Sequence, residues 1–146
     1  MIRIEEVLDR VQDLVPELAG RIEGAGKFAE LIEQDRLPQQ TPAGFVLPGG
    51  LTGGKATAAT GMFIQDFRES VIVVVVVRVA GDPLATRAID EASPIVRKVV
   101  KAVAGWGPSD APGIFVLERG ELVGAKSGAL VFQIDFALDD QLRIAA

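Results

Sequence analysis

The stretch MFIQDFRESVIVVVVVRVA, residues 62–80, decides the fold of this chain. Every residue from 71 to 77 is Val or Ile, whose branched Cβ crowds a helical turn but fits a pleated strand. We therefore predict a β-strand. Because strand side chains alternate between the two faces of a sheet, a run that is apolar at every position indicates that both faces are shielded from water. We expect the chain's own helices to cover one face and a partner molecule to cover the other.

The composition is typical of one globular domain without the usual catalytic residues. The chain has 146 residues, 49% of them hydrophobic and 24% charged, which is enough for a hydrophobic core and untypical of a disordered chain. It contains no Cys and no His, so the commonest metal ligands and the commonest general base are missing. We therefore expect no catalytic residues, no metal site and no cofactor.

Charge and hydropathy exclude two further classes. The net charge of −5 argues against a sequence-independent grip on nucleic-acid phosphates. The valine run is far shorter than the roughly 20 apolar residues that span a bilayer as a helix. We expect a soluble protein that is made in the cytoplasm and has no membrane partner.

The segments before the central strand predict two helices, a short strand and a loop. Apolar residues at helical spacing predict an amphipathic helix near the N-terminus that ends at Pro16, and a second helix over residues 27–34. Residues 44–47 predict a short apolar strand. The Gly- and Thr-rich segment 49–60 is predicted to be a flexible loop, because Gly raises backbone entropy and small side chains offer little area to pack.

The segments after the central strand predict one more helix and further strands. A helix is expected from Pro83, kinked or split by Pro94. Residues 113–125 predict two strand segments joined by a bulge or a tight turn. The last strand, residues 129–138, alternates between apolar and more polar side chains, and residues 139–144 are predicted to be a short tail packed on an edge.

Together these elements predict an α+β fold in a single domain over residues 1–146. We expect a mainly antiparallel sheet of about four to five strands with helices packed on one face. A valine-rich face or edge would remain without cover, which favours a homo-oligomer over a monomer.

One motif suggests nucleotide binding. Gly49, Gly54 and Lys55 match the first part of a phosphate-binding P-loop, but Ala56 stands where a hydroxyl would bind magnesium, and Thr57 comes one position too late. No buried parallel strand precedes the motif, and a poor helix start follows it. We interpret the segment as an arm that orders against a neighbouring molecule. A nucleotide-binding enzyme remains an alternative, and so does a small-molecule module with an apolar pocket between helix and sheet.

Four segments in this order resemble the tail terminator proteins of long-tailed bacteriophages and related prophages. The segments are GRIEGAGKFAELIEQDRLPQQTPAGFVLP (20–48), TGMFIQDFRESVIVVVVVRVAGD (60–82), KAVAGWGPSDAPGIFVLERGELV (101–123) and GALVFQIDFALDDQLRI (128–144). The phrases that carry the resemblance best are the stretch 42–48, Gln65-Asp66, Gly105-Trp106 and Leu142-Arg143-Ile144.

The resemblance implies a structural virion protein without enzymatic activity. Tail terminators typically form six-subunit rings on the head-proximal end of a finished tail tube, stop its polymerisation and offer a surface for head attachment. The implied partners are copies of itself in a homohexamer, the tail tube protein, a head-completion or stopper protein of the connector, and phage DNA that passes through the lumen without specific binding. The implied location is the head-proximal end of the virion tail, after assembly in the host cytoplasm. Another head-tail connector or tail-completion protein of similar fold is the alternative.

We predict that the oligomer and tube contacts use the Gly-rich segment, the charged start of the valine strand and the C-terminal segment. Charged pairs at a strand end suit contacts across a subunit boundary. The predicted interface residues are Gly49, Gly50, Leu51, Thr52, Lys55, Asp66, Arg68, Glu69, Leu142, Arg143 and Ile144.

Overall fold

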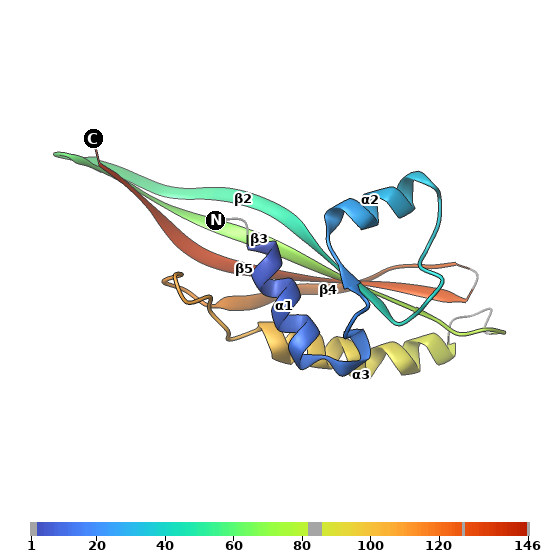
Figure 1. Cartoon of the computed structure of the whole chain (residues 1–146). Helices are drawn as coiled ribbons and strands as arrows, with labels where there is room; N and C mark the ends of the chain where they lie inside the picture. Colours follow the sequence, from blue (N-terminus) through green and yellow to red (C-terminus); the bar gives the residue numbers. More distant parts are fainter. Residues whose placement is uncertain (1–2, 82–85, 127, 146) are drawn as a thin grey trace.

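The computed structural model describes residues 3–81, 86–126 and 128–145, and it has the predicted α+β fold (Figure 1). Its five-stranded sheet has the order β1-β2-β3-β5-β4 and is antiparallel except for the β1–β2 pair. The elements are α1 (Ile4–Leu14), the 3-10 helix η1 (Pro16–Leu18), β1 (Ile22–Glu23), α2 (Ala25–Glu33), β2 (Ala43–Ala59), β3 (Met62–Arg78), α3 (Thr86–Val103), β4 (Phe115–Lys126) and β5 (Ala129–Ala145).

The valine strand lies at the centre of the sheet, as predicted. Alternate side chains of β3, such as Val73 and Val75, join the core beneath α1 and α3, whereas Val74 and Val76 pack with Leu31 of α2 on the opposite face. None of the valines from 73 to 77 is more than 3% exposed. The inference that one valine face needs a partner is therefore wrong, because α2 covers this part of the second face.

The helices thus divide between the two faces of the sheet instead of sharing one (Figure 1). α1 and α3 lie against the same face, where the Arg10 guanidinium donates to the Ala102 carbonyl over 2.8 Å and lies over the Trp106 ring. α3 continues through Pro94, which is exposed, so the predicted split is wrong. The predicted helix start at Pro83 lies outside the described residues.

The last two strands are longer than predicted. β4 is a single strand with register shifts between Leu117 and Arg119 and between Leu122 and Gly124, so the predicted turn is a bulge. β5 continues to Ala145, paired with β3 along its whole length. The prediction that residues 139–144 form a tail is therefore wrong. The backbone N–H and C=O groups of β3 need hydrogen-bond partners along this edge, and residues 139–144 supply them by continuing β5.

The predicted loop 49–60 is also different in the structure, where residues 50–59 form the outer half of β2 and pair with β3. Gly49 fits a close approach of the two strands, because a Cβ there would lie 2.8 Å from the Ser70 Cβ. We call residues 50–59, 62–68 and 139–145 the arm. Its three strands extend beyond the body of the molecule, and no helix of the described residues lies over them (Figure 1).

Candidate functional site

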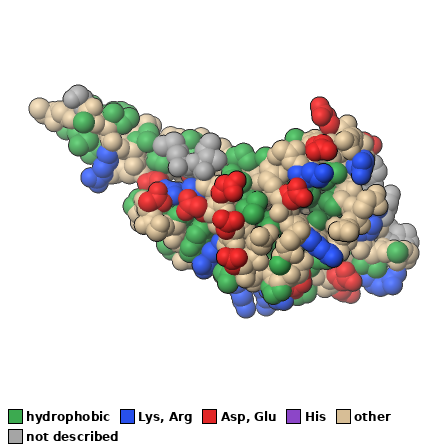
Figure 2. Space-filling model, in the orientation of Figure 1, with side chains coloured by type: hydrophobic (Ala, Val, Ile, Leu, Met, Phe, Trp, Pro, Cys, Tyr) green, Lys and Arg blue, Asp and Glu red, His purple; other side chains and the backbone are tan. Residues whose placement is uncertain are grey.

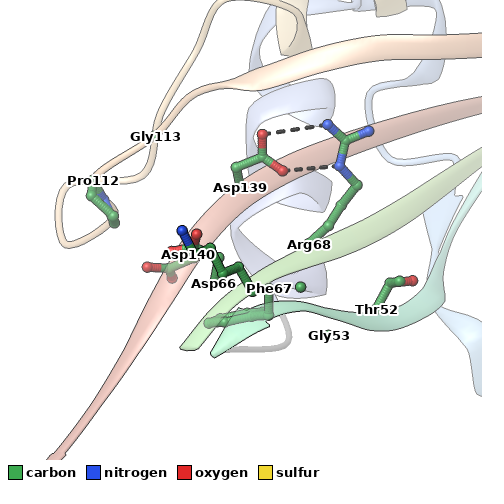
Figure 3. A pocket seen from close by; sticks show the side chains of 11 residues that line it. Thr52, Gly53, Asp66, Phe67, Arg68, Pro112, Gly113, Asp139 and Asp140 are labelled. Atoms are coloured by element: carbon green, nitrogen blue, oxygen red, sulfur yellow. Dashed lines mark hydrogen bonds and ion pairs between the residues drawn. The ribbon is translucent and has the colours of Figure 1, made fainter. Parts of the chain in front are cut away.

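The arm joins the body at a hollow of about 660 Å³, which we call the arm root (Figure 3). It is lined by strands β2, β3 and β5 and by the segment that precedes β4. The lining residues are Thr52, Gly53, Gly54, Lys55, Asp66, Phe67, Arg68, Pro112, Gly113, Asp139 and Asp140. Four predicted interface residues, Thr52, Lys55, Asp66 and Arg68, are among them.

Arg68 connects three strands at the arm root. It faces Asp139 across the β3–β5 ladder and binds that carboxylate through two nitrogens, with Nε 2.9 Å from Oδ1 and Nη2 3.3 Å from Oδ2 (Figure 3). Its Nη1 lies 2.8 Å from Glu118 Oε2 on β4. The hydrogen bond and charge of Asp139 raise the pKa of the Arg68 guanidinium further. Arg68 therefore orients the base of the arm relative to β4.

A second network, in which Arg3 and Glu69 are buried, ties the N-terminal segment to the arm root. The backbone N–H of Arg3 donates to Glu69 Oε2 over 2.6 Å, and Glu69 is only 2% exposed. The Arg3 guanidinium contacts Asp110 at 2.7 Å and lies 3.7 Å from Asp140. Burial raises the pKa of the Glu69 carboxyl, although the hydrogen bond from Arg3 opposes this shift. The hydrogen bond from Arg3 lowers the pKa of Asp110.

The structure brings the predicted interface residues together on adjacent strands. Leu142 lies opposite Gln65 and Ile144 opposite Phe63 in the β3–β5 ladder, and the predicted residues of β2 lie on the other side of β3. The prediction that Glu69 contacts a partner is wrong, because its carboxylate is buried and accepts a hydrogen bond from the Arg3 backbone inside the chain.

Sequence reasoning missed Arg3, Glu118, Asp139 and Asp140. A signal existed for the last two, because the apolar alternation of the final strand continues past Leu138 to Leu142 and Ile144. That alternation places residues 139–140 within the strand. Nothing local in the sequence indicates the partners of Arg3.

The arm root does not have the geometry of a P-loop. Gly49, Gly54 and Lys55 lie along an extended strand that leads to a turn and then to β3, not to a helix. Three aspartates line the hollow, and their negative charges would repel a phosphate group. Among the residues with described positions, no grouping of acidic side chains could hold a metal ion.

One face of the arm carries an apolar stripe, made of Leu51, Phe63, Leu142 and Ile144. Paired residues on neighbouring strands point to the same face, and the β2–β3 and β3–β5 registers place these four on the face that α1 and α3 cover in the body. Leu51 is 48% and Ile144 53% exposed. Figure 2 shows hydrophobic side chains at the surface of the tapering arm. We call these four residues the arm stripe.

None of the helices in the described part of the chain is both long and apolar enough to cross a membrane.

Comparisons with known proteins point to one family. A family model described as "Phage tail terminator protein" matches residues 1–146. A solved structure titled "Virion of native gene transfer agent (GTA) particle" contains a chain that is 14% identical to this one. The two chains superpose with a TM-score of 0.56, and the match covers 95% of this chain and 92% of that chain. At this identity the likeness concerns the fold alone. A second solved structure, also 14% identical over 97% of this chain and 92% of its own, has a TM-score of 0.44 and carries no argument. No curated protein sequence matches.

Proposed function

The chain belongs to the phage tail terminator family, and from this membership we propose that it ends the growth of a tail tube as a ring on the tube's head-proximal end. It is a structural protein of a phage tail. In the proposed role it needs no catalytic residue and no cofactor, because the ring acts through its shape and its contacts.

The observation that carries the proposal is the arm. A three-stranded extension with an exposed apolar stripe is unfavourable for an isolated molecule in water, since apolar area gains free energy by burial. In a ring or on a tube the stripe would be covered. The valine strand itself needs no partner, because a single chain already buries residues 73–77.

We propose a ring of six copies that meet head to tail, so that one patch contacts a different patch on the next copy. One axial surface of this ring binds the last ring of tube subunits, while the other no longer accepts a tube subunit. Contacts to the tube and between copies use the arm and its root. The residues proposed for these contacts are Gly49, Gly50, Leu51, Thr52, Lys55, Asp66, Arg68, Leu142, Arg143 and Ile144.

The opposite axial surface would receive a head-completion or stopper protein of the connector, and DNA would pass through the lumen. Acidic side chains such as Glu5, Asp9 and Asp13 are exposed on α1, and Figure 2 shows acidic side chains gathered on one face of the body. Negative charge at the lumen would let DNA slide instead of binding it. A ring that binds duplex DNA tightly at low salt would contradict this part of the proposal.

The test uses the protein with its cognate tail tube protein. Native mass spectrometry should show six times the mass of the single chain, either for the free protein or for protein released from tube ends. Tube polymerisation should stop when the protein is added, and electron microscopy should show it at one tube end only. Binding to DNA-filled heads with no effect on tubes would favour the alternative, a head-tail connector or tail-completion protein of similar fold.

A further inference from the structure

A shallow apolar groove lies at the end of the molecule opposite to the arm, between α3 and the strands β4 and β5. Its volume is about 290 Å³, and Ser93 is its one polar lining residue among those described. We call it the α3–β4 groove, and it is lined by Ile89, Ala92, Ser93, Val96, Leu122, Leu130 and Phe132. Ile89 is 49% and Leu122 51% exposed, so water reaches apolar side chains on both sides of the groove.

The chain cannot fill this groove with its own arm. Leu130 of the groove and Ile144 of the arm stripe are both on β5, fourteen residues apart, which is about 45 Å along a strand. β5 is paired with β3 over this whole distance, so it cannot fold back. Each chain therefore presents two separate apolar surfaces, one towards each end of its sheet.

We propose that the arm stripe of one copy packs into the α3–β4 groove of the next copy. The proposal rests on the ring described above and names the two surfaces that join its subunits. Because the stripe and the groove are different patches, their contact is heterologous, and repeating it generates a ring when the rotation between copies closes.

The apolar area available suits the centre of an interface between copies. A half-exposed Leu or Ile has about 30–60 Å² of apolar side chain left to bury. Ile89, Leu122, Leu51 and Ile144 together supply about 120–240 Å². That area is the sum over both surfaces, and a standard interface buries about 1,600 Å² in total around a small apolar centre that carries most of the binding energy. The polar surroundings of the arm and of α3 would supply the remaining area.

A second copy suits the groove better than a small molecule does. Ligand pockets usually measure about 300–1,000 Å³ and enclose most of the ligand. This groove is at the lower limit of that range, and its rim residues are half-exposed. Side chains from an extended protein surface fill such a shallow site, and the arm stripe offers four of them.

Cross-linking tests the contact directly, because the chain has no Cys of its own. The double variant Ser93→Cys/Ile144→Cys has one thiol in the groove and one on the stripe. A short thiol-reactive cross-linker should join successive copies into a ladder that extends beyond two chains. Each single variant should give at most two linked chains. The control Asp9→Cys/Ile144→Cys, with its first thiol on the exposed side of α1, should give no ladder.

A substitution gives an independent measurement. Leu122→Asp places a charge at the half-exposed groove rim, so the chain should still fold, and the association constant between copies should fall at least tenfold. Leu122→Met should preserve association. Small apolar ligands should not raise the melting temperature, because the groove is not a ligand pocket.

The outcomes separate this contact from the ring itself. A six-fold mass without a cross-linked ladder, and without an effect of Leu122→Asp, overturns the arm-and-groove contact but leaves the ring. A ladder that stops at two chains indicates a reciprocal dimer and overturns the contact as proposed. A chain that stays single at millimolar concentration and on tube ends overturns both.

Discussion

The close approach of Gly113 to β5 gives a sharp test of the arm root. A Cβ on Gly113 would lie 2.6 Å from the Asp139 carbonyl oxygen, closer than a side-chain carbon approaches a backbone oxygen. The obstacle is backbone within a paired strand, so Gly113→Ala must displace the segment before β4 or the strand β5 itself. Overpacking of this kind costs about 1–3 kcal/mol. For a chain of this size we expect the melting temperature to fall by about 3–10 °C.

The measurement is thermal unfolding of the single chain, with amide hydrogen exchange as a second readout. Asp139 also holds Arg68, so exchange in the arm segment of β5 should accelerate in Gly113→Ala. Gly26→Ala is the matched control, because a Cβ at Gly26 meets nothing within 4 Å and the residue lies in α2. There Ala should stabilise the helix by roughly 0.5–1 kcal/mol. If Gly113→Ala melts at the wild-type temperature, the described contact between Gly113 and β5 is wrong.

Three further changes address the charged groups. Arg68→Glu puts a third carboxylate beside Asp139 and Glu118, and like charges on neighbouring strands repel. We expect several-fold weaker tube capping in the polymerisation assay, whereas Arg68→Lys should cap almost as well as the wild type. Unchanged capping by Arg68→Glu would remove Arg68 from the proposed interface. Burial raises the pKa of Glu69 in the folded chain above its ordinary value of 4.5, so the folded state binds the proton more tightly than the unfolded state. The melting temperature of the wild type relative to that of Glu69→Gln should therefore fall as the pH rises through and above that value, because the lowered pKa of Asp110 acts in both proteins alike. Parallel pH profiles of the two proteins would refute the assignment. Arg3→Met removes the guanidinium that contacts Asp110 and Asp140, so the midpoint of urea unfolding should drop; an unchanged midpoint would show that the network adds no stability.

The central strand was predictable because its composition allows one interpretation. A run of β-branched residues at every position fits a strand with two covered faces, and the structure confirms this for residues 73–77. What covers each face was not predictable. The apolar residues Phe28 and Leu31 of α2 pack on Phe45 and Val74, but an all-valine strand presents the same surface on both sides and does not specify which helix covers which.

The arm shows how pairing overrides local composition. Glycine and threonine in residues 50–59 favour a loop on their own, yet β3 offers its backbone groups along the whole segment and the ladder forms with two register shifts. The predicted interface residues came together because they belong to three adjacent strands. The sequence could not distinguish Glu69 from Asp66 and Arg68, since its burial depends on Arg3, which is 66 residues away in the chain.

β5 carries part of the groove at one end and part of the stripe at the other, so in the proposed ring the length of the paired strands β2, β3 and β5 would set the spacing of subunits. Adding two residues to the middle of each of these three strands would lengthen the subunit repeat by about 7 Å and leave every side chain on its original face. Adding one residue to β5 alone would turn Leu142 and Ile144 to the opposite face and divide the stripe. If the proposed contact joins the subunits, relatives with wider or narrower rings should differ by even numbers of residues in each of these strands.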